Sequence, residues 1–164
     1  MTELQNGLIL LIKSGLTGKS YKLPEDLDLA EVFPIAIEHG VDVIVYYGAV
    51  NCGMKANSPQ MREQRMRVFQ IITGSEQQMV DVRRVLEAFE AHGIDHMPLK
   101  GTLLRALYPD AAMRKMSDAD ILIRVEQYET IRGIMKELGF KEKYESDHEL
   151  AWSTNALQIG RAHV

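Results

Sequence analysis

Cysteine is almost absent from this chain of 164 residues, in which Cys52 is the only one. A single cysteine cannot close a disulfide within the chain, and such sparing use is typical of proteins in a reducing cytoplasm. His92 and His96 flank an expected turn, and His148 stands beside Glu149, so no zinc motif is predicted. The sequence therefore indicates a cytoplasmic protein and excludes a disulfide-stapled secreted fold.

Long apolar runs and an excess of basic residues are also missing. No stretch approaches the ~18 consecutive apolar residues that a transmembrane helix needs. The chain carries 19 Lys and Arg residues against 23 Asp and Glu residues, which gives a formal net charge of -4. General binding of nucleic acids depends on a basic face, and none is evident. We therefore expect neither membrane insertion nor general nucleic-acid binding.

A glycine is missing from the segment that imitates a nucleotide-binding loop. Thr17-Gly18-Lys19-Ser20 matches the end of a P-loop, but Lys13 occupies the position of the first glycine. A P-loop also follows a strand, whereas this segment follows a helical pattern. We interpret it as a turn that ends a helix.

Helical patterning is what the first half of the sequence contains. The expected helices lie at residues 4–12, 24–37, 41–50 and 58–93, the second opened by Pro24. Segment 41–50 is apolar nearly throughout and fits a helix or a strand, and its helical neighbours favour a helix. Gly74 marks a candidate kink or break in the last helix. We predict a helical region over residues 1–85.

The pattern changes after Gly93. Short strands and helices are expected at residues 94–99, 102–107, 119–125, 127–138, 140–144 and 148–152. This alternation of strands and helices predicts a sheet covered by helices. The whole chain is therefore predicted to be an α+β protein, with an N-terminal helical region followed by a small core with a mixed sheet.

Asp118 and Asp120 stand two residues apart, where a polar turn gives way to the apolar run Ile121-Leu122-Ile123. In a strand, such residues point to the same face, roughly 6–7 Å apart at about 3.3 Å per residue. Two carboxylates on one face suit Mg²⁺, which takes carboxylate oxygens and leaves positions open for phosphate. The spacing predicts a metal site at Asp118 and Asp120.

Lys100-Gly101-Thr102 lies upstream, between an expected strand and an expected helix. A glycine at the start of a helix lets the backbone N–H groups approach a phosphate, and Lys100 adds a positive charge. Arg114 either binds phosphate or pairs with Asp118 or Asp120. A phosphate-binding turn followed by an Asp-x-Asp strand is the pattern of metal-dependent phosphoryl or nucleotidyl transfer.

Three motifs in order carry a resemblance to a known family. They are Leu99-Lys100-Gly101, Tyr108-Pro109-Asp110 and Arg114-Lys115-Met116-Ser117-Asp118-Ala119-Asp120-Ile121-Leu122-Ile123. The segment resembles the nucleotidyltransferase superfamily of DNA polymerase β, and more closely a bacterial family of uncharacterised nucleotidyltransferases. The usual Gly-Gly or Gly-Ser pair of the superfamily is here Gly101-Thr102, which keeps a hydroxyl but adds bulk.

The resemblance implies transfer of a nucleoside monophosphate from an NTP to a hydroxyl of an acceptor, either a small molecule or a protein. Asp118 and Asp120 would hold Mg²⁺ as the catalytic and metal-binding residues, and Gly101 and Thr102 would cradle the β and γ phosphates. Two rival hypotheses are an antitoxin-like enzyme that modifies a protein, and a non-catalytic interaction module with a degenerate nucleotidyltransferase core.

The end of the sequence breaks the pattern. Residues 158–164 resemble a translated sequencing adapter and are expected to be a foreign tail. The nucleotidyltransferase-like core would then cover residues 86–157 and be truncated at the C-terminus. Relatives in the superfamily use a third carboxylate from a later strand. Truncation would remove that group and inactivate the chain, unless Glu149 substitutes for it.

Overall fold

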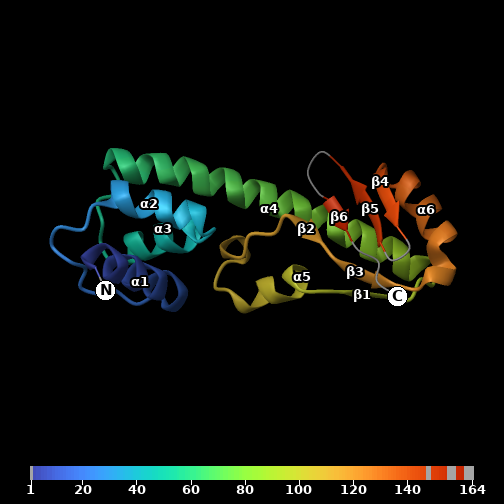
Figure 1. Ribbon diagram of the computed structural model, residues 1–164, viewed down its shortest axis with the longest axis horizontal. Helices are drawn as coiled ribbons and strands as arrows, with labels where there is room; N and C mark the ends of the chain where they lie inside the picture. The colour runs from blue at the N-terminus through green and yellow to red at the C-terminus, as the bar shows by residue number, and fades with distance from the viewer. Residues whose placement is uncertain (1, 147–148, 155–157, 161–164) are drawn as a thin grey trace. The chain divides into compact units, whose positions relative to one another are not determined.

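The computed structural model describes residues 2–146, 149–154 and 158–160, and it confirms an α+β fold with an N-terminal helical region (Figure 1). Contacts between residues divide the chain into two compact units. Unit 1 comprises the chain up to Thr73 together with Leu107–Met113. Unit 2 comprises Gly74–Ala106 and the described residues from Arg114 onward.

Unit 1 is built from helices. They are α1 (Glu3–Thr17), α2 (Leu29–Glu38), α3 (Asp42–Asn51), the first part of α4 (Pro59–Ala91) and the 3-10 turn η2 (Ala111–Met113). The helix expected over 41–50 is confirmed as α3, and α4 continues through Gly74 without a break. Gly18, with a φ of 69°, ends α1 and confirms that the P-loop-like segment is a helix-ending turn.

The start of α2 differs from the prediction. The helix begins at Leu29 rather than at Pro24, because the Asp28 side chain accepts a hydrogen bond from the Ala30 N–H over 2.8 Å. A proline suits a first helical turn but leaves the free N–H groups there without an acceptor. An aspartate at the N-cap supplies that acceptor, so the helix starts where the cap is.

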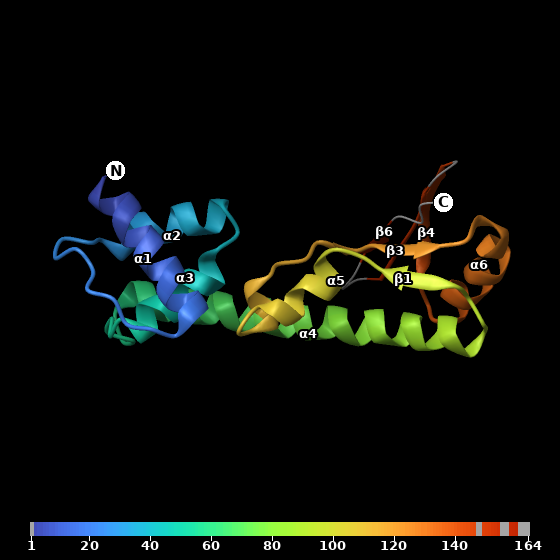
Figure 2. The same cartoon turned by 90° about the horizontal axis from the view of Figure 1, so that it is seen from below.

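Close contact between α1 and α3 depends on two glycines (Figure 2). A Cβ atom at Gly15 would lie 2.1 Å from the Ile44 carbonyl oxygen, and one at Gly48 would lie 2.0 Å from the Leu11 carbonyl oxygen. Two helix backbones approach this closely only where no side chain stands between them. The buried Ser14 adds a hydrogen bond from its Oγ to the Gly48 carbonyl oxygen over 3.3 Å.

The segment Leu107–Met113 carries the Tyr-Pro-Asp motif and belongs to unit 1. Asp110 accepts a hydrogen bond from Tyr47 Oη at 3.0 Å and another from the Ala112 N–H at 2.8 Å. Each bond uses a different carboxylate oxygen, so Asp110 anchors the segment on α3. Burial raises the pKa of Tyr47, and the hydrogen bond and charge of Asp110 raise it further.

Unit 2 holds the strands. Its elements are the rest of α4, β1 (His96–Pro98), α5 (Gly101–Leu104), β2 (Asp118–Ala119), β3 (Ile121–Ile123), α6 (Tyr128–Glu137), β4 (Lys141–Ser146), β5 (Glu149–Ser153), β6 (Gln158–Gly160) and the 3-10 turns η1 (Arg105–Leu107), whose last residue belongs to unit 1, and η3 (Val125–Gln127). One sheet pairs β1 with β3, antiparallel. The other has the order β2-β6-β5-β4, in which only the β2–β6 pair is parallel. The sheet is therefore mixed, as expected.

The helix after the Lys-Gly turn is shorter than predicted. α5 ends at Leu104, and the chain continues as the 3-10 turn η1. The first residue of η1, Arg105, is buried and donates a hydrogen bond to Ser75 Oγ on α4. This tertiary contact fixes the tighter turn at the place where the apolar pattern alone favoured a continued helix.

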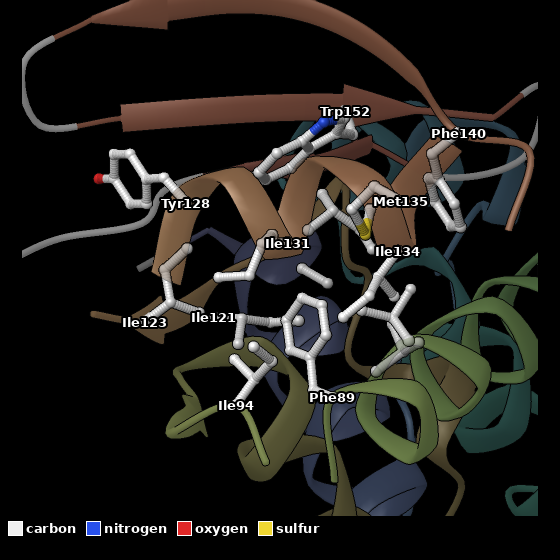
Figure 3. Close-up of a cluster of buried hydrophobic side chains, with 14 residues drawn as sticks. Phe89, Ile94, Ile121, Ile123, Tyr128, Ile131, Ile134, Met135, Phe140 and Trp152 are labelled. Atoms are coloured by element: carbon white, nitrogen blue, oxygen red, sulfur yellow. The ribbon is translucent and has the colours of Figure 1, made fainter. Parts of the chain in front are cut away.

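A single cluster of apolar side chains forms the core of unit 2 (Figure 3). It takes residues from α4, β3, α6 and β5, among them Val82, Val85, Phe89, Ile121, Ile131, Met135 and Trp152. The sequence places the end of the helical region near residue 85, whereas the compact units divide at Thr73. The reason is that the apolar stripe of α4 continues from Val82 onward into the core of unit 2.

The segment expected to be a foreign tail begins with a strand. Gln158–Gly160 forms β6, which pairs with Asp118 and Ala119 of β2 and with β5, and Ile159 is buried. Residues 161–164 lie outside the described residues. The foreign origin of residues 158–164 stays a prediction.

We expect Gly48→Ala to lower the free energy of unfolding by about 1–3 kcal/mol, because its methyl group would overlap the backbone of α1. Urea unfolding followed by circular dichroism measures this change. Gly74→Ala is the matched control, since nothing lies within 4 Å of its added Cβ. In a helix interior the control should gain about 0.5–1 kcal/mol. Equal stability of the two variants would contradict the close approach.

Asp110→Asn should lower the pKa of Tyr47 toward the ordinary tyrosine value of about 10, without reaching it, because burial remains. Tyrosinate absorbance, corrected with Tyr47→Phe, measures this titration. A raised pKa in the folded state stabilises the fold at pH values below the unfolded tyrosine pKa. That contribution is lost as the pH rises through the folded pKa. Identical titration of Tyr47 in the wild type and Asp110→Asn would show that the carboxylate does not act on it.

Candidate functional site

The turn at Lys100 connects β1 to α5 in an unusual backbone conformation. Among the described residues, Lys100 is the only one other than glycine with a positive φ, 44°. Residues other than glycine rarely adopt a positive φ, and those that do are held there by the surrounding structure. The turn therefore aims the Lys100 side chain in a direction that a relaxed turn would not give.

Asp120 lies at the junction between two strands. The continuous strand predicted over 119–125 is wrong, because β2 ends at Ala119 and β3 begins at Ile121. Ala119 pairs with Ile159 of β6, whereas Ile121 pairs with Pro98 of β1. The chain thus changes its pairing partner at Asp120. At that point the Asp120 carbonyl oxygen accepts a hydrogen bond from the Leu99 N–H over 2.9 Å.

A cavity of about 210 Å³ opens at this junction. It is lined by Lys100, Gly101, Arg114, Lys115, Met116, Ser117, Asp118 and Asp120. Of the residues predicted for the site, only Thr102 is not among them. Two motifs about twenty residues apart in the sequence are thereby brought to one place, with acidic and basic side chains facing the same space.

The Asp120 carboxylate is buried, with only 8% of the residue exposed. Its Oδ2 accepts a hydrogen bond from Lys100 Nζ at 2.8 Å. Its Oδ1 is buried and has no hydrogen-bond partner in the described structure. A buried carboxylate oxygen without a partner is costly, so it marks a position where a cation would be favourable.

Asp118 has a different environment. It is only partly buried, and its Oδ1 accepts a hydrogen bond from Ser117 Oγ at 3.0 Å. Both aspartates line one cavity, although the strand expected to carry them is interrupted at Asp120.

Gly101 and Thr102 lie against Met116. A Cβ atom at Gly101 would lie 3.3 Å from Met116 Cγ and 3.4 Å from its sulfur. The Thr102 hydroxyl donates to the same sulfur over 3.8 Å. Met116 therefore packs on this side of the turn, while Gly101 also lines the cavity.

Arg114 does not make the ion pair that was one of its two predicted roles. Its Nη1 donates to the Lys115 carbonyl oxygen over 3.2 Å, and Lys100 takes the place beside Asp120. The sequence did not identify this pairing, because Lys100 and Asp120 are distant along the chain. It also missed Lys115, Met116 and Ser117 as lining residues, although their position between Arg114 and Asp118 was an available signal.

The donor set fits one hard cation. Mg²⁺ in phosphoryl-transfer sites is bound through one or two carboxylates, with water and phosphate completing its ligands. Asp118 and Asp120 supply two carboxylates, and the partnerless Oδ1 of Asp120 supplies a free oxygen. Within the described residues, no group of three or more His, Cys, Asp or Glu side chains is placed to hold a metal. Glu149 belongs to β5, but its side chain lies outside what the structure describes.

Comparison with known proteins places the chain in a family. No curated protein and no solved structure is significantly similar to the chain. A family model described as an uncharacterised nucleotidyltransferase matches residues 25–162, which include the cavity and most of both units. Since the match covers more than half of the chain, the protein belongs to this family of uncharacterised nucleotidyltransferases.

Proposed function

We propose that this protein binds an NTP together with Mg²⁺ and transfers the nucleoside monophosphate to a hydroxyl of an acceptor. One observation carries the proposal. The buried Asp120 carboxylate, with an oxygen that has no partner, shares a cavity with Asp118 and with three basic side chains. A nucleotidyl transfer needs both charges, because carboxylates bind the cation and basic groups bind the polyphosphate.

Asp118 and Asp120 would hold the Mg²⁺ ion in this proposal. When bound, the ion neutralises charge on the triphosphate and so favours departure of pyrophosphate. Lys100 and Arg114 line the same cavity and would bind the outer phosphates. Their positive charges would also orient the α-phosphate toward the acceptor.

The turn at Gly101 and Thr102 would supply backbone contacts to the phosphates. Gly101 has no side chain, so a phosphate oxygen could approach the backbone closely after Met116 moves aside. The Thr102 hydroxyl, now directed to the Met116 sulfur, would then be released to donate to the same phosphate.

The acceptor must lose a proton during transfer, and a third carboxylate would serve this step or bind a second ion. Glu149 on β5 is the candidate within this chain. Without such a group the chain would bind nucleotide but would not turn it over. We propose that the acceptor is a small molecule or a protein.

The rival hypotheses make different predictions. A protein-modifying enzyme would transfer label from a radioactive NTP to a polypeptide, whereas an enzyme for a small acceptor would not. A non-catalytic interaction module would not bind an NTP through Asp118 and Asp120 at all.

No helix in the described part of the chain is both long and apolar enough to cross a membrane. We propose a cytoplasmic location.

Asp118→Asn and Asp120→Asn should each weaken Mg²⁺-dependent NTP binding by at least about tenfold, because each removes a proposed metal ligand. Isothermal titration with a non-hydrolysable NTP and Mg²⁺ measures the affinity. Circular dichroism should show the wild-type secondary structure in both. Asp95→Asn is the matched control, since that carboxylate is exposed and pairs with Arg124 outside the cavity. Unchanged affinity in both site variants would refute the metal assignment.

Gly101→Val should harm nucleotide binding more than Lys100→Ala. A β-branched side chain would block the approach of the phosphate to the backbone, whereas the loss of Lys100 removes one largely solvated charge. Nucleotide affinities of the two variants, measured with saturating Mg²⁺, give the comparison. The reverse order would make Lys100 the principal phosphate contact and would discard the backbone cradle.

A further inference from the structure

The ion pair between Lys100 and Asp120 joins a buried carboxylate to an exposed ammonium. The Asp120 side chain is 10% exposed and is fixed at the strand junction, whereas the Lys100 side chain is 62% exposed. The Lys100 ammonium can therefore leave into water without exposing a core residue. Asp120 cannot follow it, because its backbone is held by the Leu99 N–H.

The Lys100 ammonium lies on one oxygen of the carboxylate whose other oxygen, Oδ1, has no partner. Lys100 Nζ lies 2.8 Å from Asp120 Oδ2, which is a full charge-assisted hydrogen bond. A cation that used both oxygens of Asp120, or that approached from the cavity, would meet the positive charge of Lys100. A cation in the cavity would therefore compete with the ammonium for this carboxylate.

Arg114, another basic side chain that lines the cavity, does not lie on this carboxylate. Arg114 donates to the Lys115 carbonyl oxygen, and the Asp118 carboxylate accepts from Ser117. The positive φ of Lys100 holds its side chain on the side of Asp120. A lysine in a conformation that favours glycine indicates a position fixed for a purpose other than turn formation.

We propose that Lys100 is a built-in competitor for the metal site, which neutralises Asp120 in the metal-free protein and is displaced when the cation binds. The released ammonium then has a new partner in the polyphosphate of the NTP. A cation that binds alone must break the ion pair and leaves the Lys100 ammonium without a new partner. When the NTP binds as well, its polyphosphate becomes the new partner of the ammonium. The site would therefore bind Mg²⁺ weakly by itself and tightly with the nucleotide. This inference rests on the proposed function.

Such coupling is reciprocal. When only a fraction of the protein molecules is in the state that binds a ligand, the apparent affinity for that ligand is reduced by that fraction. By drawing Lys100 away from Asp120, the NTP would restore the full affinity of the site for the cation. The cation would in turn increase the affinity for the NTP by the same factor. The lysine thereby restricts occupation of the metal site to the complex with substrate.

The test uses Mn²⁺ as the probe and measures its binding by electron paramagnetic resonance. Lys100→Met keeps the length of the side chain and removes the charge. Without nucleotide, it should bind Mn²⁺ about tenfold more tightly than the wild type. The further gain in Mn²⁺ affinity on adding a non-hydrolysable NTP should shrink by a similar factor.

Lys115→Met is the matched control, because it removes a charge that also lines the cavity. A general change in electrostatic field would raise Mn²⁺ affinity equally in both variants, and that result would overturn the proposal. Equal or weaker Mn²⁺ binding by Lys100→Met than by the wild type would overturn it as well.

A metal-free measurement examines the ion pair itself. Thermal midpoints in EDTA of the wild type, Lys100→Met, Asp120→Asn and the double variant form a mutant cycle. The proposal requires coupling between the two sites, and additive shifts would overturn it. Failure of the proposed function gives a separate signature, since neither the wild type nor Lys100→Met would then bind Mn²⁺. Loss of Mn²⁺ binding in Asp120→Asn, without a gain in Lys100→Met, would leave the proposed function standing and reject only the competition.

Discussion

The attachment of Asp120 to the turn before α5 is the constraint on which the candidate site depends. Its carbonyl oxygen accepts from the Leu99 N–H at 2.9 Å, and its carboxylate accepts from Lys100 Nζ at 2.8 Å. Two successive residues, Leu99 and Lys100, thus hold the backbone and the side chain of Asp120. The neighbours of Asp120 point the opposite way, with Ala119 and Ile121 buried in the core of unit 2. Core packing therefore fixes which face the carboxylate occupies.

The three family motifs lie in two different places in the fold. Lys100 and Gly101 of the first motif line the cavity of unit 2 together with Arg114 to Asp118 and Asp120 of the third. Tyr108-Pro109-Asp110 lies in unit 1, where Asp110 accepts hydrogen bonds from Tyr47 and from the Ala112 N–H. Both carboxylate oxygens of Asp110 accept hydrogen bonds, whereas the buried Asp120 carboxylate keeps one oxygen without a partner. Hydrogen bonding thus separates two aspartates that look equally significant in the sequence.

Elements that depend on nearby residues could be predicted. The end of α1 at Gly18 follows from the local preference of glycine for a left-handed backbone. The helical state of α3 followed from its helical neighbours. The start of α2 was misplaced because proline was given more weight than Asp28, whose side chain caps the helix. The interruption at Asp120 was missed, because pairing of β2 with β6 and of β3 with β1 depends on distant strands.

The sequence by itself determined the family, the α+β class and the group of residues to examine, because motif order and periodicity are local properties. Only the tertiary structure decided that Lys100, and not Arg114, lies on Asp120, and that Met116 packs on Gly101. These contacts join residues that approach one another only after the strands have paired. The burial that leaves one oxygen of Asp120 without a partner is also a property of the folded core, which no spacing along the chain expresses.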